Sequence, residues 1–167
     1  DGNLEEGEQG MKLIIAEKPS LGRNIAAGIE SMPGAEKMRR RDGFLEGNGY
    51  MVSWAFGHLF SLEDIEHYCP SPDGSGRWTM ENLPCFPEKF DFSLRHDRKK
   101  GVDPGVEKQF RLLVSLCNRA DTEEIINAGD ADREGEITIR LCISHALHTE
   151  KPCKRLWLPD QTPQTVV

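Results

Sequence analysis

The sequence predicts an α/β fold in which about four mostly parallel strands form a sheet flanked by helices. Short apolar segments of strand length alternate along the chain with longer segments of helical periodicity. This alternation favours a parallel sheet, because each helix carries the chain back to the end at which the previous strand began. The chain has 167 residues, 37% of them hydrophobic, which suits one globular domain with its own core.

The chain is predicted to open with a strand, a loop and a helix. Residues 11–17, MKLIIAE, form a short apolar run that is rich in isoleucine. Ser20 is the expected N-cap of the helix that follows. Leu21, Ile25 and Ile29 recur every four residues there, so they form one apolar stripe that faces the core.

Residues 42–62 are predicted to form a hairpin. The segment Gly47-Asn48-Gly49 is typical of a turn, and apolar side chains alternate behind it. These alternating residues are Tyr50, Val52, Trp54 and Phe56. From residue 69 to residue 101 the composition changes to Pro, Gly, Asp and Arg, which indicates a long irregular connection.

The second half of the chain is predicted to contain two further helices and two strands. Asp103 and Pro104 have the character of an N-cap and a first helical residue, and an apolar stripe follows them. A strand is expected at 123–129, a helix at 134–147 and a short final strand at 154–158. Trp54 and Trp157 lie in expected strands and are interpreted as core residues.

We predict one domain at residues 11–167, preceded by a flexible leader or cloning remnant at residues 1–10. The leader has four acidic residues and no base, so it contributes −4 to the net charge of −7 and leaves −3 for the rest. A nearly neutral domain lacks the basic balance that is typical of nucleic-acid-binding domains. An anionic partner must therefore be held by a local cluster of side chains or through metal ions.

Membrane insertion and a zinc site are both disfavoured. No apolar run approaches the roughly 18 residues that span a membrane, and no signal peptide is visible. The five cysteines are widely spread and include no CxxC pair. This spacing predicts free thiols in the reducing cytoplasm.

An acidic segment, AGDADREGE at residues 128–136, suggests a metal site. Ligands of such sheets bind beyond the carboxyl ends of the strands. If the strands at 11–17 and 123–129 are neighbours, Glu17, Asp130, Asp132 and Glu134 converge at one edge. Clustered carboxylates repel one another unless a cation compensates, and Mg²⁺ favours such oxygen ligands beside a phosphate.

Two other interpretations of this segment are weaker. An EF-hand would require a bidentate glutamate at its twelfth position, where Leu141 stands, and a helix in place of the preceding strand. The acidic residues would also suit a solvated helix start, since negative charge is favourable at a helix N-terminus. A carboxylate at the end of the first strand, Glu17, makes the metal site the better explanation.

Several motifs together resemble the Toprim region of type IA DNA topoisomerases, the topoisomerase III branch above all. The order and separation of the motifs agree with that family, and the resemblance extends from Met11 to the end of the chain. Ala131 is a minor departure, because the family commonly has proline there. The motifs are IIAEKPS (14–20), WAFGHL (54–59), RWTMENLPCFPEKF (77–90), AGDADREGE (128–136) and RLWL (155–158).

The resemblance implies a Rossmann-like Toprim domain that supports DNA cleavage. Enzymes of this family cut one DNA strand through a tyrosine, pass another strand through the break and reseal it, with Mg²⁺ in the Toprim site. By resemblance, Glu17, Asp130 and Asp132 are metal ligands and Glu134 is a further acidic member. The partners implied are single-stranded or underwound DNA and the downstream domains of the same chain, with no membrane. Mn²⁺ is a possible substitute for Mg²⁺.

Four basic or titratable residues are candidates for catalysis and DNA binding. Lys18 resembles the lysine that contacts the scissile phosphate, although a solvent-facing loop lysine is the alternative. Arg133 is expected either to clamp a phosphate or to pair with a neighbouring carboxylate. His58 is expected to transfer a proton or contact a phosphate, with a structural histidine as the alternative. Arg155 is assigned to DNA binding or to a surface salt bridge.

The nucleophile of such an enzyme is not evident in this sequence. Tyr50 lies in an expected strand and Tyr68 precedes Cys69-Pro70, and neither matches the setting of the family's catalytic tyrosine. We therefore predict an N-terminal Toprim fragment that is inactive alone. The alternatives are another Toprim enzyme, such as a primase or nuclease, and a DNA-binding module without turnover.

Overall fold

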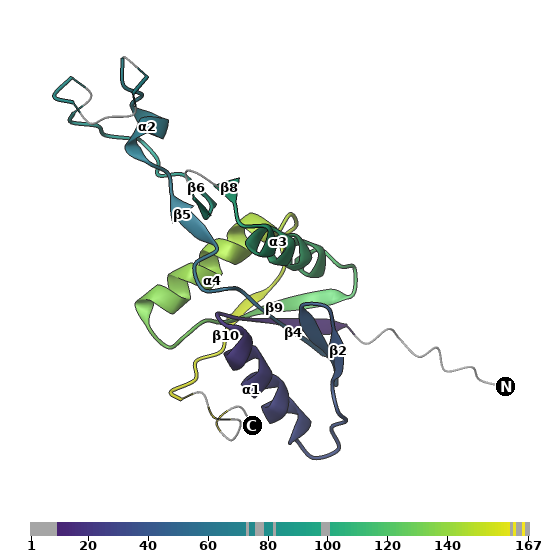
Figure 1. Ribbon diagram of the computed structural model, residues 1–167. Helices are drawn as coiled ribbons and strands as arrows, with labels where there is room; N and C mark the ends of the chain where they lie inside the picture. The colour runs from purple at the N-terminus through teal and green to yellow at the C-terminus, as the bar shows by residue number, and fades with distance from the viewer. Residues whose placement is uncertain are drawn as a thin grey trace.

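The computed structural model describes residues 10–72, 74–75, 79–81, 83–97, 101–160, 162 and 165 (Figure 1). Apart from Gly10, the predicted leader lies outside these residues, as do Arg77, Trp78 and Asn82 of the motif at 77–90. In chain order the elements of the first half are β1 (Met11–Ala16), α1 (Pro19–Glu30), β2 (Arg39–Arg41), β3 (Phe44–Gly47), β4 (Tyr50–Trp54), β5 (Phe60–Leu62) and α2 (Ile65–Tyr68). They are followed by β6 (Phe92–Leu94), β7 (His96–Asp97), β8 (Gly101–Val102), α3 (Pro104–Cys117), β9 (Thr122–Ala128), α4 (Arg133–Ala146) and β10 (Cys153–Arg155).

A six-stranded sheet with the order β10-β9-β1-β4-β3-β2 forms the centre of the molecule. Strands β10, β9, β1 and β4 are parallel to one another, and β3 and β2 extend the sheet in antiparallel fashion. The prediction of about four mostly parallel strands is therefore confirmed. The predicted neighbours β1 and β9 pair along their whole length, with Ala16 opposite Ala128. All four parallel strands end at the same side, which we call the carboxyl edge.

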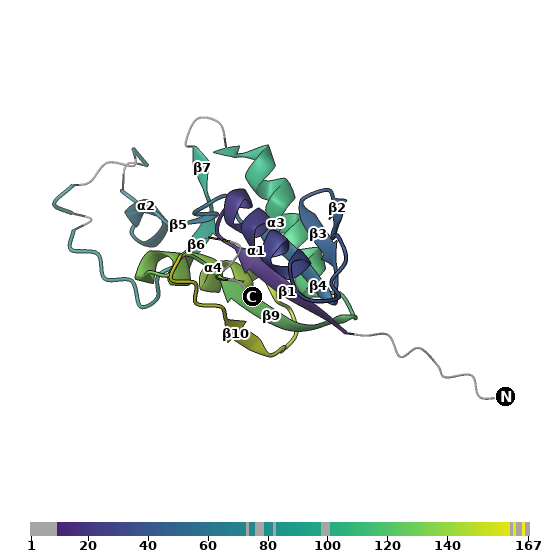
Figure 2. The same cartoon turned by 90° about the horizontal axis from the view of Figure 1, so that it is seen from below.

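Helices cover both faces of the sheet, as Figures 1 and 2 show, with α1 on one face and α3 and α4 on the other. Successive residues of β1 point to opposite faces. Ile14 packs in the cluster that contains the α1 stripe, whereas Leu13 and Ile15 pack against α3 and α4. The predicted stripe Leu21, Ile25 and Ile29 is at most 2% exposed. The apolar periodicity of the sequence thus locates the core correctly.

The helix starts agree with the sequence except at α1. Asp103 caps α3 through its carboxylate, which accepts hydrogen bonds from Gly105 N and Val106 N, and this confirms the predicted cap. Helix α1 instead begins at Pro19, so its N-cap is Lys18 and the expected cap at Ser20 is wrong. Proline suits the first helical position because the N–H that it lacks would have no partner there.

The predicted hairpin is present but shorter than expected. Strands β3 and β4 pair around a turn in which Asn48 and Gly49 have φ values of 55° and 78°, as a tight two-residue turn requires. The expected extension to residue 62 is wrong, because β4 ends at Trp54. After it, Gly57 N donates to Glu17 O at 3.0 Å, so this backbone is held at the carboxyl edge.

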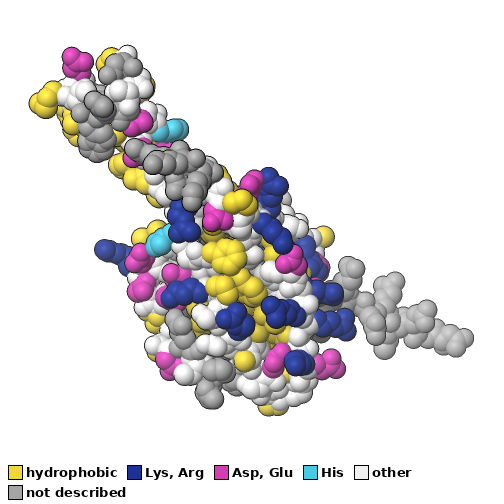
Figure 3. Space-filling model, in the orientation of Figure 1, with side chains coloured by type: hydrophobic (Ala, Val, Ile, Leu, Met, Phe, Trp, Pro, Cys, Tyr) yellow, Lys and Arg dark blue, Asp and Glu magenta, His cyan; other side chains and the backbone are white. Residues whose placement is uncertain are grey.

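Residues 60–94 form an arm that projects from the domain (Figure 1). Its base is the antiparallel pair β5–β6, and its outer part holds α2. The expected irregular connection at 69–101 thus contains short strands, which are too brief to give a periodic signal. Figure 3 shows hydrophobic side chains distributed over the arm. Among the described residues of the arm, Met80 and Phe86 are the most exposed apolar ones, at 89% and 84%.

A disulfide joins Cys69 to Cys85 within the arm, with their Cα atoms 6.3 Å apart. The prediction of free thiols is therefore wrong for this pair. The two cysteines are 16 residues apart in sequence, and only the folding back of the arm brings them together. Cys117 and Cys142 are free and buried, and Cys153 is free and exposed.

Thiol titration should separate these three classes of cysteine. Burial raises the pKa of Cys117 and Cys142 to about 12, so their reactive thiolates are scarce at neutral pH. Without reductant, a chromogenic disulfide reagent should react rapidly with Cys153 alone in the native protein. Denaturation should add the two buried thiols, and reduction should then add Cys69 and Cys85. Three rapidly reacting thiols in the native, unreduced protein would contradict the disulfide.

The final strand is also shorter than predicted, since β10 ends at Arg155. Trp157 follows it and is 59% exposed, so its interpretation as a core residue is wrong. Trp54 is partly buried against the α1 cluster, as expected. No helix within the described ranges combines the length and the apolar character needed to cross a membrane.

Candidate functional site

The carboxyl edge brings Glu17, Lys18 and Asp130 together from two neighbouring strands. Glu17 follows β1 and is only 8% exposed, and its Oε2 accepts a hydrogen bond from Asp130 N at 3.1 Å. Lys18 Nζ lies 2.8 Å from Asp130 Oδ2. The hydrogen bond to Asp130 is the main cause that raises the pKa of the Lys18 ammonium above its ordinary value. The predicted convergence of these strand ends is thus present, with the Lys18 ammonium paired to the Asp130 carboxylate.

Two glycines allow the loop after β9 to lie against the start of α4. A Cβ atom on Gly129 would stand 2.2 Å from Gly135 O, which is a backbone clash. A Cβ atom on Gly135 would stand 2.6 Å from Asp130 N and 2.8 Å from Glu17 Oε2. Only glycine permits such close approach of backbone to backbone. The glycines of AGDADREGE therefore hold Asp130 against Glu17.

Asp132 does not join this carboxylate pair. It is the N-cap of α4, and its Oδ1 accepts a hydrogen bond from Gly135 N at 2.6 Å. This bond satisfies one of the N–H groups that a helix start leaves without a partner. Within the described residues, no three acidic, histidine or cysteine side chains converge as a metal-binding group. The structure thus brings together two of the expected metal ligands and places Asp132 beside them on the helix.

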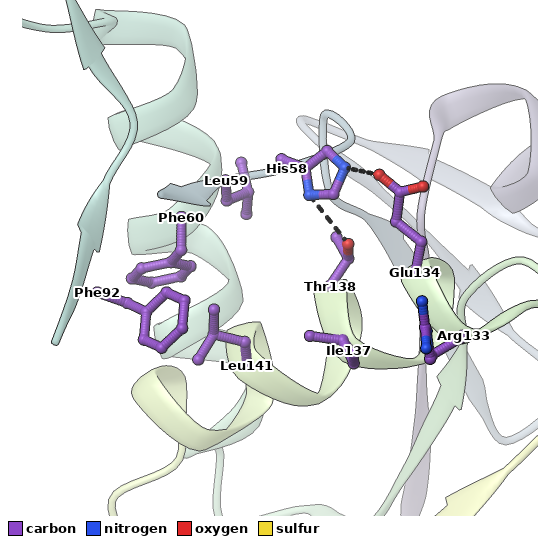
Figure 4. Close-up of a pocket in the computed structure, with 9 residues that line it drawn as sticks. All are labelled: His58, Leu59, Phe60, Phe92, Arg133, Glu134, Ile137, Thr138 and Leu141. Carbon is purple, nitrogen blue, oxygen red and sulfur yellow. Dashed lines mark hydrogen bonds and ion pairs between the residues drawn. The ribbon is translucent and has the colours of Figure 1, made fainter. Parts of the chain in front are cut away.

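His58 and Glu134 form a second polar pair next to the carboxylates. His58 Nε2 lies 2.8 Å from Glu134 Oε1, and His58 Nδ1 lies 3.2 Å from Thr138 Oγ1 (Figure 4). Both partners of the imidazole are thus side chains of the first turns of α4. Sequence reasoning missed Thr138, although its place four residues after Glu134 puts both on one helix face. The imidazole is about half exposed, so a ligand can reach it.

Arg155 is engaged by the protein's own backbone. Its Nη1 donates to Asn127 O, Gly129 O and Leu156 O at 2.9–3.1 Å, and its Nη2 donates to Asp130 O at 2.9 Å. Its Nε lies 2.5 Å from a carboxylate oxygen of Glu136, as an ion pair without hydrogen-bond geometry. The guanidinium therefore joins the end of β10 to the loop that carries Asp130. No sequence pattern indicates this arrangement, because the acceptors are backbone carbonyls.

Arg133 is the most available cation of the acidic segment. It is the first residue of α4, its side chain is exposed, and it forms no ion pair with any residue that the structure describes. We expected Arg133 either to clamp a phosphate or to pair with a neighbouring carboxylate. The carboxylate pair is absent from the described part of the chain. Its guanidinium is free to bind an anion.

The donors of this site are of the type that suits a magnesium ion. Glu17 accepts a hydrogen bond from the backbone N–H of Asp130, and the Asp130 carboxylate is paired with the Lys18 ammonium, so two residues with carboxylate oxygens meet at this edge. Mg²⁺ is commonly held by one or two carboxylates, with water and substrate phosphate as its remaining ligands. The donor types at this edge therefore suit the ion, while Asp132 is engaged as the N-cap of α4.

Comparison with known proteins decides the family. A sequence model described as the Toprim domain matches residues 12–159. The chain belongs to the Toprim domain family. This Toprim chain is 36% identical to DNA topoisomerase 3 of Shouchella clausii over 93% of its own length. It is 39% identical to DNA topoisomerase 3 of Staphylococcus saprophyticus and 35% identical to that of Bacillus subtilis, over 92% of its length in each case.

The Toprim chain covers only a small part of these relatives. It spans 19% of the length of each of the three topoisomerases. The similarity between this chain and the three topoisomerases thus covers one segment. That segment contains the ends of β1 and β9 and the acidic loop that follows β9. The expected resemblance to the topoisomerase III branch is confirmed at the level of sequence similarity and fold.

Proposed function

We propose that this chain is the magnesium-binding Toprim segment of a type IA DNA topoisomerase. In that role it supports cleavage and resealing of one DNA strand during strand passage. The single observation that carries the proposal is the convergence of Glu17, Lys18 and Asp130 at the carboxyl edge. The names of the relatives favour a topoisomerase over a primase, a nuclease or a module without turnover.

Each residue of the site has a role in this proposal. Glu17 and Asp130 would hold Mg²⁺ or Mn²⁺, with Asp132 and Glu134 as further acidic members, and a bound ion would supply charge neutralisation at the reacting phosphate. Lys18, which pairs with Asp130 in this structure, would contribute its positive charge beside the same phosphate. Arg133 binds a neighbouring phosphate.

His58 and Arg155 complete the assignment. His58 is positioned by Thr138 and Glu134 to contact the DNA or transfer a proton near the break. Arg155 fixes the loop of Asp130, and its predicted DNA contact would have to use the exposed part of its side chain. The proposal also places the protein in the cytoplasm.

The nucleophile is proposed to lie in downstream domains. Tyr68 is occupied in the arm, where its hydroxyl accepts from Asp91 N at 2.7 Å and donates to Asp91 O at 3.2 Å. Tyr50 lies beside Lys12 at the start of β4, away from the carboxyl edge. A broken strand must be stored as a covalent ester before resealing. The 167-residue chain should therefore neither relax supercoiled DNA nor form a denaturation-resistant DNA adduct, with or without Mg²⁺.

Metal binding gives the direct test of the proposed site. Mn²⁺ titrated into the chain and followed by electron paramagnetic resonance should bind weakly, and single-stranded DNA should tighten the binding by supplying phosphate oxygens. Asp130→Asn should weaken Mn²⁺ binding by about tenfold or more, because a charged ligand is lost. The matched control is Asp42→Asn, whose carboxylate is 83% exposed and pairs with Lys108. Equal affinities for the two variants would contradict the proposed metal site.

A further inference from the structure

A cavity of about 320 Å³ lies between α4 and the base of the arm (Figure 4). One end of this cavity, which we call the edge cavity, is polar and includes His58, Arg133 and Glu134. The other end is apolar and includes Phe92 and Ile137. Figure 4 shows the rings of the arm facing the aliphatic side chains of α4 across this space. The edge cavity thus combines a charged rim with an apolar interior.

The polar end of the edge cavity adjoins the carboxylate site. His58 follows Gly57, whose N–H donates to Glu17 O at 3.0 Å. Glu134 lies two residues after the Asp132 cap on the same helix. The polar end of the cavity thus lies beside the strand end that carries Glu17 and Lys18.

The apolar end offers surfaces that have no cover within the described chain. Phe92 is 38% exposed and Ile137 is 54% exposed, although both lie next to a charged site. Phe60 is fixed behind them, with its ring edge-on to Phe110 at a centroid distance of 5.1 Å. A rigid aromatic wall beside exposed apolar groups suits a flat ring that stacks on it.

The charges at the rim favour a ligand that carries a phosphate. Arg133 has no ion-pair partner among the described residues, whereas the Glu134 carboxylate is already paired with His58. An apolar peptide side chain would leave this guanidinium without a counterion. A nucleotide satisfies both ends, because its base is apolar on its faces and its phosphate is anionic.

We infer that the edge cavity is a subsite for one base of the DNA strand, stacked against Phe92 and Ile137 while Arg133 binds its phosphate. This inference rests on the proposed function and adds to it a contact to the base itself. Stacking of this kind depends little on base identity, since every base has a π face. The subsite thus holds a nucleotide near the carboxylates and fixes the register of the strand without selecting a sequence.

The test compares two single strands of about eight nucleotides, one of deoxyadenylate and one with the same backbone but no bases. Fluorescence anisotropy with the complete 167-residue chain at low salt gives their affinities. The unaltered chain should prefer the strand with bases by roughly tenfold. Phe92→Ala and Ile137→Ala should each remove most of this preference and leave binding of the baseless strand unchanged.

Phe86→Ala is the matched control, because this ring is 84% exposed on the outer arm and lies outside the edge cavity. It should retain the full preference, and circular dichroism should show that all three variants fold. Ile137 lies on α4, so its variant reports on the cavity even if Phe92→Ala loosens the arm.

Three outcomes would overturn the inference. The first is a preference for bases that survives both cavity variants, and the second is an equal loss of affinity for both strands. In either case, intact Mn²⁺ binding that depends on Asp130 would leave the proposed function standing. The third is a complete failure of the unaltered chain to bind DNA, which would overturn the subsite and the DNA-binding role together.

Discussion

Replacing Gly129 by alanine is expected to lower the free energy of unfolding by about 3 kcal/mol or more, because the added methyl group has no space. Its Cβ would stand 2.2 Å from Gly135 O and 2.7 Å from Gly135 C, both of them backbone atoms at the start of α4. The helix would have to move away from β9, and Asp130 would move away from Glu17. Urea unfolding should show the lost stability, and Mn²⁺ titration should show weaker binding.

Gly34→Ala is the control for this experiment. Gly34 has a φ of 81° and nothing within 4 Å of an added Cβ, so only the backbone conformation is penalised. That penalty is about 1–2 kcal/mol. A Gly129→Ala protein that is no less stable than Gly34→Ala would show that the loop and α4 are not in close contact.

Arg155→Met is expected to cost about 2 kcal/mol of stability and to weaken metal binding. Its side chain is 22% exposed, and its loss would remove a donor from the carbonyls of Asn127, Gly129 and Asp130. Leu156 N and Asp132 N still donate to the first and the last of these, so the Gly129 carbonyl is the one left without this donor, at a cost on the order of 1 kcal/mol or more. The partly buried carboxylate of Glu136 would also lose a cation. Chemical denaturation and Mn²⁺ titration of the same samples would measure both effects.

Arg140→Met provides a closely matched comparison. Arg140 pairs with the same carboxylate, that of Glu136, but is 77% exposed. An exposed pair of this type contributes about 0.3–0.5 kcal/mol. If Arg155→Met behaved like Arg140→Met, the guanidinium would be a surface group, and its contact with the loop of Asp130 would not matter for the site.

The sequence by itself determined the order of the elements, the two faces of the sheet and the place of the site. The continuous apolar run of β1 requires burial on both faces of the sheet, and the stripe of α1 covers one of them. A parallel sheet follows from strands that alternate with helices. Parallel strands end at one edge, so Glu17 and Asp130 had to approach if β1 and β9 were neighbours. These features depend on local periodicity and on chain topology, which a single sequence records.

Only the tertiary structure decided which partner each polar group takes. Asp132 could bind an ion or cap α4, and the geometry of the loop selects the cap. Arg155 binds backbone carbonyls, which every residue has and which therefore leave no signal in the sequence. Cys69 and Cys85 meet because the arm folds back on itself, and the edge cavity exists because the arm returns beside α4. Such contacts join segments far apart in the chain, so their physical cause is packing in three dimensions.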